Sequence, residues 1–215
     1  MIRVSQATAL DDATRAALAS GRAEPALGLF IDTLMEMRGI SDHEGEIIAA
    51  TVLESETPAA MSPSALDMAF AAIERGGEPV KQRLLTYPEL DALPVALREL
   101  IRDTEGKRAW AYSGPGIRRL DLGATGPLKL EVIRLGAGKA VPWHTHKGRE
   151  LTLCVHGEFS DSIATYGPGD FSITDGSIRH QPKAHPGAPA YALAVTDAGL
   201  KFEGILGTIQ RIFGQ

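Results

Sequence analysis

Two histidines and one glutamate lie between two glycines in the segment 138–157. His144 and His146 are two residues apart, so on a β-strand both side chains would point to the same face. Imidazoles and a carboxylate together suit a divalent metal such as Zn, Fe, Mn or Ni. The best candidate for a further ligand is His180, which follows a turn and a short β-rich run. The predicted metal ligands are therefore His144, His146, Glu150 and His180.

The part of the chain that must position these ligands shows a period of two. From about residue 107 onward, short β-rich runs alternate with Gly and Pro turns. Such runs predict an antiparallel barrel or jelly roll. If the strand that begins at Glu150 is regular, then Glu150, Thr152 and Cys154 share one face. Cys154 would then point into the barrel as a small apolar side chain.

The first 76 residues have a helical pattern instead, and the predicted helices span residues 8–20, 24–38, 41–55 and 62–76. Their ends are marked by capping residues and by glycines such as Gly39. Four short amphipathic helices have little core of their own. We therefore expect this small bundle to dock on a partner or on the second domain.

The segment between the helical and the β-rich parts is interrupted by prolines, which predicts a connector with a helical turn or two around Leu97. The predicted organisation is a helical domain over residues 1–85, a connector over 86–106 and a β-barrel domain over 107–215. This division predicts an α+β fold.

The charge of the chain is divided unevenly between the two halves. Residues 1–80 hold five Arg and no Lys against 13 Asp and Glu, a net charge of −8. Residues 81–215 hold 17 Lys and Arg against 14 Asp and Glu, a net charge of +3. An acidic surface repels nucleic acid and favours a basic partner, including a protein that itself binds DNA. The alternative is a solvated acidic helical face. Lys and Arg are scattered without a basic run, so we expect no direct nucleic-acid binding.

Membrane and export signals are not evident in the sequence. No run approaches the ~18 apolar residues of a membrane span, and no signal-peptide core follows Met1. Cys154 is the single cysteine, which excludes an intramolecular disulfide and fits a reducing compartment. These features predict a cytoplasmic protein without membrane association.

The segment from Gly138 to Gly157 resembles the first cupin motif, G-x5-H-x-H-x3-E-x6-G, at every specified position. The second motif, G-x5-P-x-G-x2-H, is matched at Gly169 and His180, but Asp175 and Ser177 replace its Pro and Gly. In cupins the three His and the Glu of these motifs bind a metal inside a small β-barrel, which implies the same role for the four predicted ligands. The alternative is a polar strand pair without metal, because some cupins lack one.

Nearly the whole chain resembles the ChrR-type anti-sigma factors, in which an acidic helical domain precedes a C-terminal cupin domain. In that family the helical domain binds an extracytoplasmic-function sigma factor and holds it away from RNA polymerase. The cupin domain is needed for the response that releases it. The resemblance implies a sigma factor as partner and zinc as the divalent metal.

One departure concerns the zinc site of the family's helical domain, an H-x3-C-x2-C motif. The corresponding helix here reads Asp32-Thr-Leu-Met-Glu36-Met-Arg-Gly39, and the N-terminal half has no Cys and only His43 as histidine. A Cys/His zinc site cannot be built from these residues. Either the bundle folds without zinc, or the domain no longer inhibits a sigma factor.

Two functions remain open from the sequence. The leading hypothesis is a transcription regulator whose acidic helices bind a sigma factor and whose cupin domain senses or transmits a stress signal. Its predicted docking stripe lies on the helix 24–38, with Phe30 as anchor, and consists of Leu27, Phe30, Ile31 and Leu34. The alternative is a cupin enzyme, a dioxygenase or isomerase with Fe or Mn and an open metal position. A homodimer through the cupin domain is compatible with either.

Overall fold

The structure is a computed structural model that describes residues 24–40, 47, 50, 51, 54, 57, 60, 62–74, 86–123, 126–197 and 200–202. The helix predicted over 8–20 lies outside the described residues. Of the helix predicted over 41–55, residues 47, 50, 51 and 54 are described, and all four are helical. Within the described ranges, no helix is long and apolar enough to cross a membrane.

The helix predicted over residues 24–38 is confirmed as α2 (Pro25–Arg38). Its proline stands in the first turn, where the missing N–H would have had no helical partner. Gly39 ends the helix with a φ of 60°, a left-handed conformation that favours glycine. The N–H groups of Gly39 and Ile40 then bond to the carbonyls of Glu36 and Met35, at 3.1 and 3.0 Å. The local sequence therefore sets both ends of α2.

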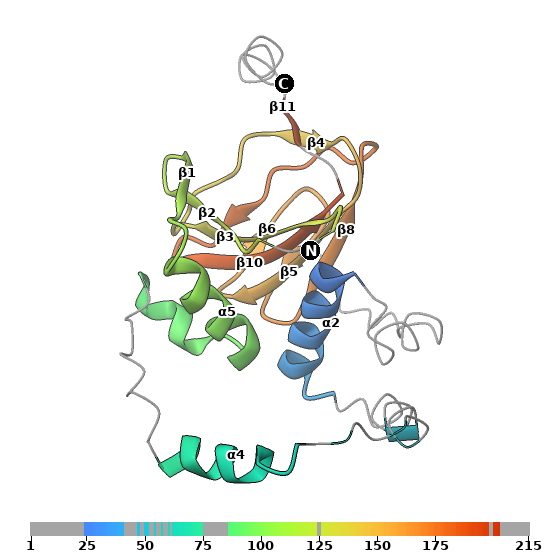
Figure 1. Cartoon of the computed structure of the whole chain (residues 1–215). Helices are drawn as coiled ribbons and strands as arrows, with labels where there is room; N and C mark the ends of the chain where they lie inside the picture. Colours follow the sequence, from blue (N-terminus) through green and yellow to red (C-terminus); the bar gives the residue numbers. More distant parts are fainter. Residues whose placement is uncertain are drawn as a thin grey trace.

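The β-rich pattern is confirmed, because every strand pairing in the described part of the chain is antiparallel. The strands are β1 (Ala111–Gly114), β2 (Ile117–Asp121), β3 (Lys129–Leu135), β4 (His144–His146), β5 (Glu150–His156), β6 (Phe159–Ser160), β7 (Thr165–Tyr166), β8 (Phe171–Thr174), β9 (Lys183–Ala184), β10 (Ala190–Thr196) and β11 (Leu200–Phe202). The largest sheet has the order β1-β2-β3-β10-β5-β8, and the smaller ones have the orders β11-β4 and β7-β6-β9. This arrangement is the predicted α+β fold with a jelly-roll barrel (Figure 1).

The large sheet is buried on both faces, and its middle strand β10 shows why. Ala190, Ala192 and Ala194 point toward the barrel interior, where they pack with residues of the smaller sheets. The alternate residues Tyr191, Leu193 and Val195 point outward, into a second core that they share with the helices. Because the inward side chains are small, they leave space for a cavity inside the barrel.

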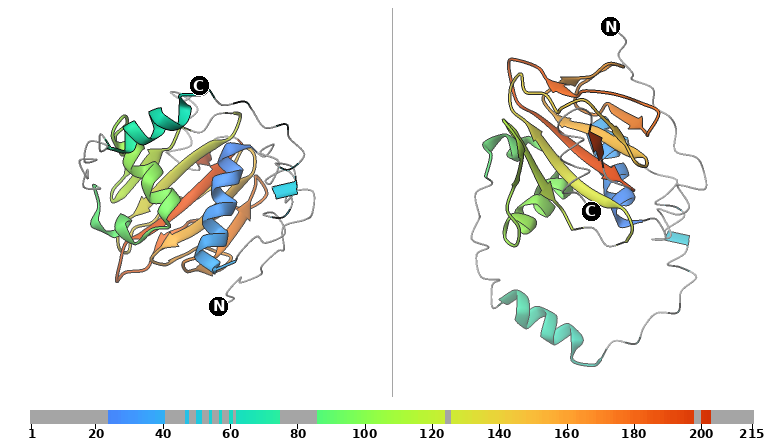
Figure 2. Two further views of the ribbon diagram at one scale, coloured as in Figure 1. Left: turned by 60° about the horizontal axis from the view of Figure 1, so that its bottom comes forward. Right: turned by 90° about the horizontal axis from the view of Figure 1, so that it is seen from above.

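Helices cover the outer face of this sheet (Figure 2). The connector predicted over residues 86–106 contains more helix than expected: η1 (Pro88–Ala92) is followed by α5 (Val95–Glu105), an 11-residue helix. Leu97 and Ile101 of α5 are fully buried in the outer core, which explains why the helix extends beyond a turn or two. α2 packs beside α5 on β10 and β5.

The predicted docking stripe on α2 is wrong for its two central residues. Phe30 is 2% exposed and Ile31 is 3% exposed, because both are buried against the outer face of the sheet. Among the described residues of the helical part, exposed apolar side chains lie on α4 (Ala65–Glu74), at Leu66, Met68 and Phe70, and also at Ile40 and Ile47. Figure 1 shows α4 well away from the barrel and from α2.

Candidate metal centre

The three predicted histidine ligands lie together and are buried. His144 and His146 point to the same side of β4, as their spacing predicts. His180 is brought to β4 by a backbone bridge, in which His144 and His180 each donate an N–H to the other's carbonyl at 3.1 Å. The bridge joins residues 36 positions apart, so the cluster exists only in the folded barrel.

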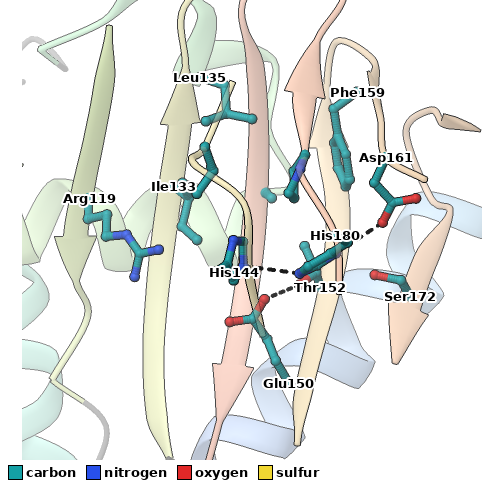
Figure 3. Close-up of a pocket in the computed structure, with 13 residues that line it drawn as sticks. Arg119, Ile133, Leu135, His144, Glu150, Thr152, Phe159, Asp161, Ser172 and His180 are labelled. Atoms are coloured by element: carbon teal, nitrogen blue, oxygen red, sulfur yellow. Dashed lines mark hydrogen bonds and ion pairs between the residues drawn. The ribbon is translucent and has the colours of Figure 1, made fainter. Parts of the chain in front are cut away.

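The ligand atoms of the three rings lie within 4.8 Å of one another, and Figure 3 shows the contact between His144 and His180. His180 Nε2 lies 2.9 Å from His146 Nε2 and 3.0 Å from His144 Nε2. Two nitrogen ligands of one metal are separated by about 3 Å when bonds of about 2.1 Å meet near a right angle. Each of these two distances therefore matches a pair of nitrogen ligands on one metal.

The other ring nitrogens show which protonation state this cluster prefers. His144 Nδ1 faces the carbonyl oxygen of Pro142 at 2.8 Å, and His180 Nδ1 faces the carboxylate of Asp161 at 3.1 Å. Both partners only accept hydrogen bonds, so each Nδ1 carries the proton. When both rings are neutral, the Nε2 atom of each presents a lone pair to the other. Two lone pairs 3.0 Å apart repel unless a cation lies between them, so this donor set fits a divalent metal.

The electrostatics of His144 and His146 agree with neutral rings. Burial lowers the pKa of His144 to about 4, with further lowering by His180 and His146. Burial also lowers the pKa of His146 to about 4. Neutral imidazole is the form that binds a metal.

Glu150 lies at the same cavity but apart from the three converging nitrogens. One of its oxygens accepts a hydrogen bond from Thr152 Oγ1 at 2.9 Å, and the other lies 3.8 Å from Nδ1 of His146. That Nδ1 is buried and has no hydrogen-bond partner. The predicted common face of β5 is confirmed, since Glu150 and Thr152 line the cavity and Cys154 is buried in the barrel core.

Asp161 is a buried carboxylate that the sequence did not bring to attention. Its side chain is 1% exposed and orients His180 through Nδ1. The backbone N–H groups of Ile163 and Ala164 donate to its other oxygen at 2.8 and 3.0 Å. Burial would raise the pKa of Asp161, but the hydrogen bonds from His180 and these two amides lower it. Asp161 therefore positions the ring of His180, a candidate metal ligand.

The turn before His180 departs from the cupin motif in sequence. Hydrogen bonds of the Asp175 side chain and backbone nevertheless hold it in a turn conformation. Asp175 Oδ1 accepts hydrogen bonds from the backbone N–H and the hydroxyl of Ser177, at 2.8 and 2.6 Å. The N–H of Ile178 then bonds to the carbonyl of Asp175 at 3.1 Å. This Asx turn takes the place of the motif's Pro and Gly.

The cavity beside the histidines has a volume of about 30 Å³, which is room for one or two water molecules. Its walls are mainly apolar, with Ile133, Leu135 and Phe159 among them. Arg119 reaches the cavity from β2 and pairs with the buried Glu131 at 3.2 Å. Asp161 and Arg119 were both missed because no local spacing relates them to the histidines. The only local signal was the run Asp161-Ser-Ile-Ala164, which can form an Asx turn.

A two-layered β-barrel with histidines from β4 and from the bridge at His180 around its cavity defines a cupin-type domain. No family model matches the sequence. The anti-sigma-E factor ChrR of Cereibacter sphaeroides is 30% identical over 204 residues, which cover 92% of each chain. The chain therefore belongs to the family of ChrR-type anti-sigma factors.

Two solved structures that match the chain are the following. The crystal structure of Rhodobacter sphaeroides SigE in complex with the anti-sigma ChrR matches with 27% identity and a TM-score of 0.56, covering 87% of this chain and 97% of that chain. An RmlC-like cupin of Ralstonia eutropha matches with 15% identity and a TM-score of 0.40, covering 48% of this chain and 78% of that chain.

Proposed function

We propose that this chain is an anti-sigma factor that binds an extracytoplasmic-function sigma factor through its N-terminal helices and thereby regulates transcription. The observation that carries the proposal is the 30% identity to ChrR over 92% of each chain, which includes the helical part as well as the barrel. The barrel would sense or transmit the stress signal that ends the inhibition.

The exposed face of α4 supports a protein partner for the helical part. Leu66 is 60% exposed and Phe70 is 56% exposed, one helical turn apart on the same face. Apolar side chains of this size gathered on one short helix are typical of an interface. The net charge of −8 over residues 1–80 would complement a basic surface of the partner.

The test uses the full chain, co-expressed with an extracytoplasmic-function sigma factor from the same genome. We expect a complex on size-exclusion chromatography whose dissociation constant rises with salt, and inhibition of transcription by polymerase with that sigma factor. Phe70→Ala should weaken binding by more than ~1 kcal/mol if Phe70 is an interface anchor. Tyr112→Ala is the matched control, since Tyr112 is also an exposed aromatic residue, on β1 of the barrel. No complex with any such sigma factor at low salt would refute the proposal.

We further propose that the barrel binds one divalent metal, zinc by family resemblance, at His144, His146, Glu150 and His180. The convergence of three Nε2 atoms supports the histidines, and the position of Glu150 on the cavity wall supports the fourth ligand. A zinc ion bound there would act as a Lewis acid or as a structural centre. The chain's own part is to keep His144 and His146 neutral by burial, and to orient the rings of His144 and His180 through Pro142 and Asp161.

The cavity also bears on the enzyme alternative. A metal beside a cavity is what a dioxygenase or isomerase needs. The cavity has a volume of about 30 Å³, which is room for one or two water molecules. The regulatory function is favoured over an enzyme by the 30% identity to an anti-sigma factor over 92% of each chain. We also propose that the protein acts in the cytoplasm, without touching nucleic acid or membrane itself. A homodimer through the cupin domain stays a prediction.

A further inference from the structure

The apolar face of α2 is already occupied in this structure. Ala26, Phe30 and Ile31 are buried against the outer face of the large sheet, in one core with residues of β5 and β10. The ring of Phe30 meets the ring of Phe171 on β8 edge to face, with centroids 6.3 Å apart. Packing of this kind is a specific contact and not only a covered surface.

Polar contacts also fix the C-terminal end of α2 on two sides. Arg38 Nε donates to the carbonyl oxygen of Gly169 at 2.9 Å, and its guanidinium lies over the Phe171 ring, 5.5 Å from the centroid. Glu36 Oε1 accepts the N–H of Val95 at 3.0 Å. This carboxylate thereby caps the start of α5, where a negative charge is favourable. The last turn of α2 is thus tied to the β7–β8 turn and to α5.

α4 is left without a comparable partner among the described residues. Leu66, Met68 and Phe70 are all more than half exposed. A helix of 10 residues is marginal in water unless it buries an apolar face. In a helical bundle, the apolar face of α4 would pack against the apolar face of α2. That face of α2 is already buried against the barrel.

We propose that the outer face of β5, β8 and β10 is a docking surface for α2, and that the barrel and the sigma factor compete for this helix. This inference rests on the proposed function. The apolar face of α2 can be buried only once, either on the sheet or in a bundle that pairs it with α4 against the sigma factor. Docking on the sheet therefore lowers the apparent affinity for the sigma factor, because only the fraction of molecules in which α2 is released can bind it.

The barrel side of the contact allows a test that leaves the helices unchanged. Phe171→Ala removes the ring that meets both Phe30 and Arg38. Ile173→Ala is the matched control, because Ile173 lies on the same strand and the same face but is 56% exposed. Phe171→Leu keeps an apolar side chain in the sheet and removes only the ring contacts, so it serves if Phe171→Ala fails to fold.

The first measurement is amide hydrogen exchange of α2 in the full chain, without a sigma factor. We expect α2 to exchange roughly tenfold faster in Phe171→Ala, less so in Phe171→Leu, and as in the wild type in Ile173→Ala. Strand β10 should keep its protection in every variant, which shows that the barrel remains folded. Unchanged exchange of α2 in Phe171→Ala would overturn the proposal that the sheet is a docking surface for α2. This outcome does not depend on whether the chain binds a sigma factor.

The second measurement is the dissociation constant for the sigma factor. Release of α2 should tighten binding roughly fivefold to tenfold in Phe171→Ala and leave it unchanged in Ile173→Ala. If α2 is released but binding is no tighter, competition is wrong although docking is right. If the wild type and all variants bind no sigma factor, the proposed function fails, and the exchange experiment still decides whether the barrel holds α2.

Discussion

Phe171 and Ser172 are neighbours on β8 that face opposite layers of the molecule. Ser172 lines the cavity beside the histidine cluster, and Phe171 contacts Phe30 of α2 on the outer face. Their partners on β5 repeat the division, because Thr152 pairs with Ser172 and Leu153 pairs with Phe171. The β5–β8 pair therefore separates the candidate metal centre from the docked helix by the thickness of one sheet.

The first prediction concerns metal content. The wild type should bind about one divalent metal per chain, and the double variant His144→Ala, His146→Ala should lose most of it, because two of the three converging Nε2 ligands are removed. Elemental analysis of the purified proteins measures this directly. His185→Ala is the control, since His185 is an exposed histidine outside the cluster. Full metal retention in the double variant would disprove the site.

Asp161→Asn should weaken metal binding by about 10–100-fold without unfolding the barrel. The backbone N–H groups of Ile163 and Ala164 would hold the amide oxygen of Asn, so its NH₂ group would face His180 Nδ1. That arrangement moves the ring proton of His180 to Nε2 and blocks the ligand atom. Competition with a chromophoric chelator measures the affinity.

The same substitution at Asp103 serves as the control for Asp161→Asn. Asp103 is an exposed carboxylate on α5 that pairs with Lys107 at 2.7 Å. Metal affinity should be unchanged in Asp103→Asn. An Asp161→Asn variant that binds metal like the wild type would show that His180 does not depend on this carboxylate.

A third prediction separates two phenylalanines of the helical part. Phe30→Ala should lower the free energy of unfolding by about 3–5 kcal/mol, because it leaves a cavity between α2 and the sheet. Phe70→Ala should change it by less than about 0.5 kcal/mol, since that ring is exposed on α4. Denaturant unfolding of the full chain gives both values. Equal losses would mean that α4 is packed as tightly as α2.

Cys154 should resist thiol reagents in the native protein. Burial and the nearby carboxylate of Asp170 raise the pKa of its thiol to about 12, so the reactive thiolate is scarce at pH 8. Labelling should be complete only after unfolding, as mass spectrometry can show. The raised pKa also means that this thiol's contribution to stability is present below pH 9 and is lost as the pH rises toward 12. Rapid labelling at pH 8 would indicate that the barrel opens.

The sequence by itself determined the features that depend on local spacing. The His-x-His pair predicts two side chains on one face of a strand, and β4 presents them so. Period two predicts that Glu150, Thr152 and Cys154 share a face of β5, and they do. Gly39 marks the end of α2, because a left-handed residue there needs no distant contact.

Only the tertiary structure decided which surfaces and side chains meet. The periodicity of residues 24–38 shows that one face is apolar, but not whether a partner protein or the sheet covers it, and the burial of Phe30 answers that for this structure. The same holds for Asp161, which lies 19 residues from His180 and reaches it only because β6 and β9 pair. Local sequence sets the direction in which a side chain points, whereas its partner depends on chain segments that come together only when the barrel closes.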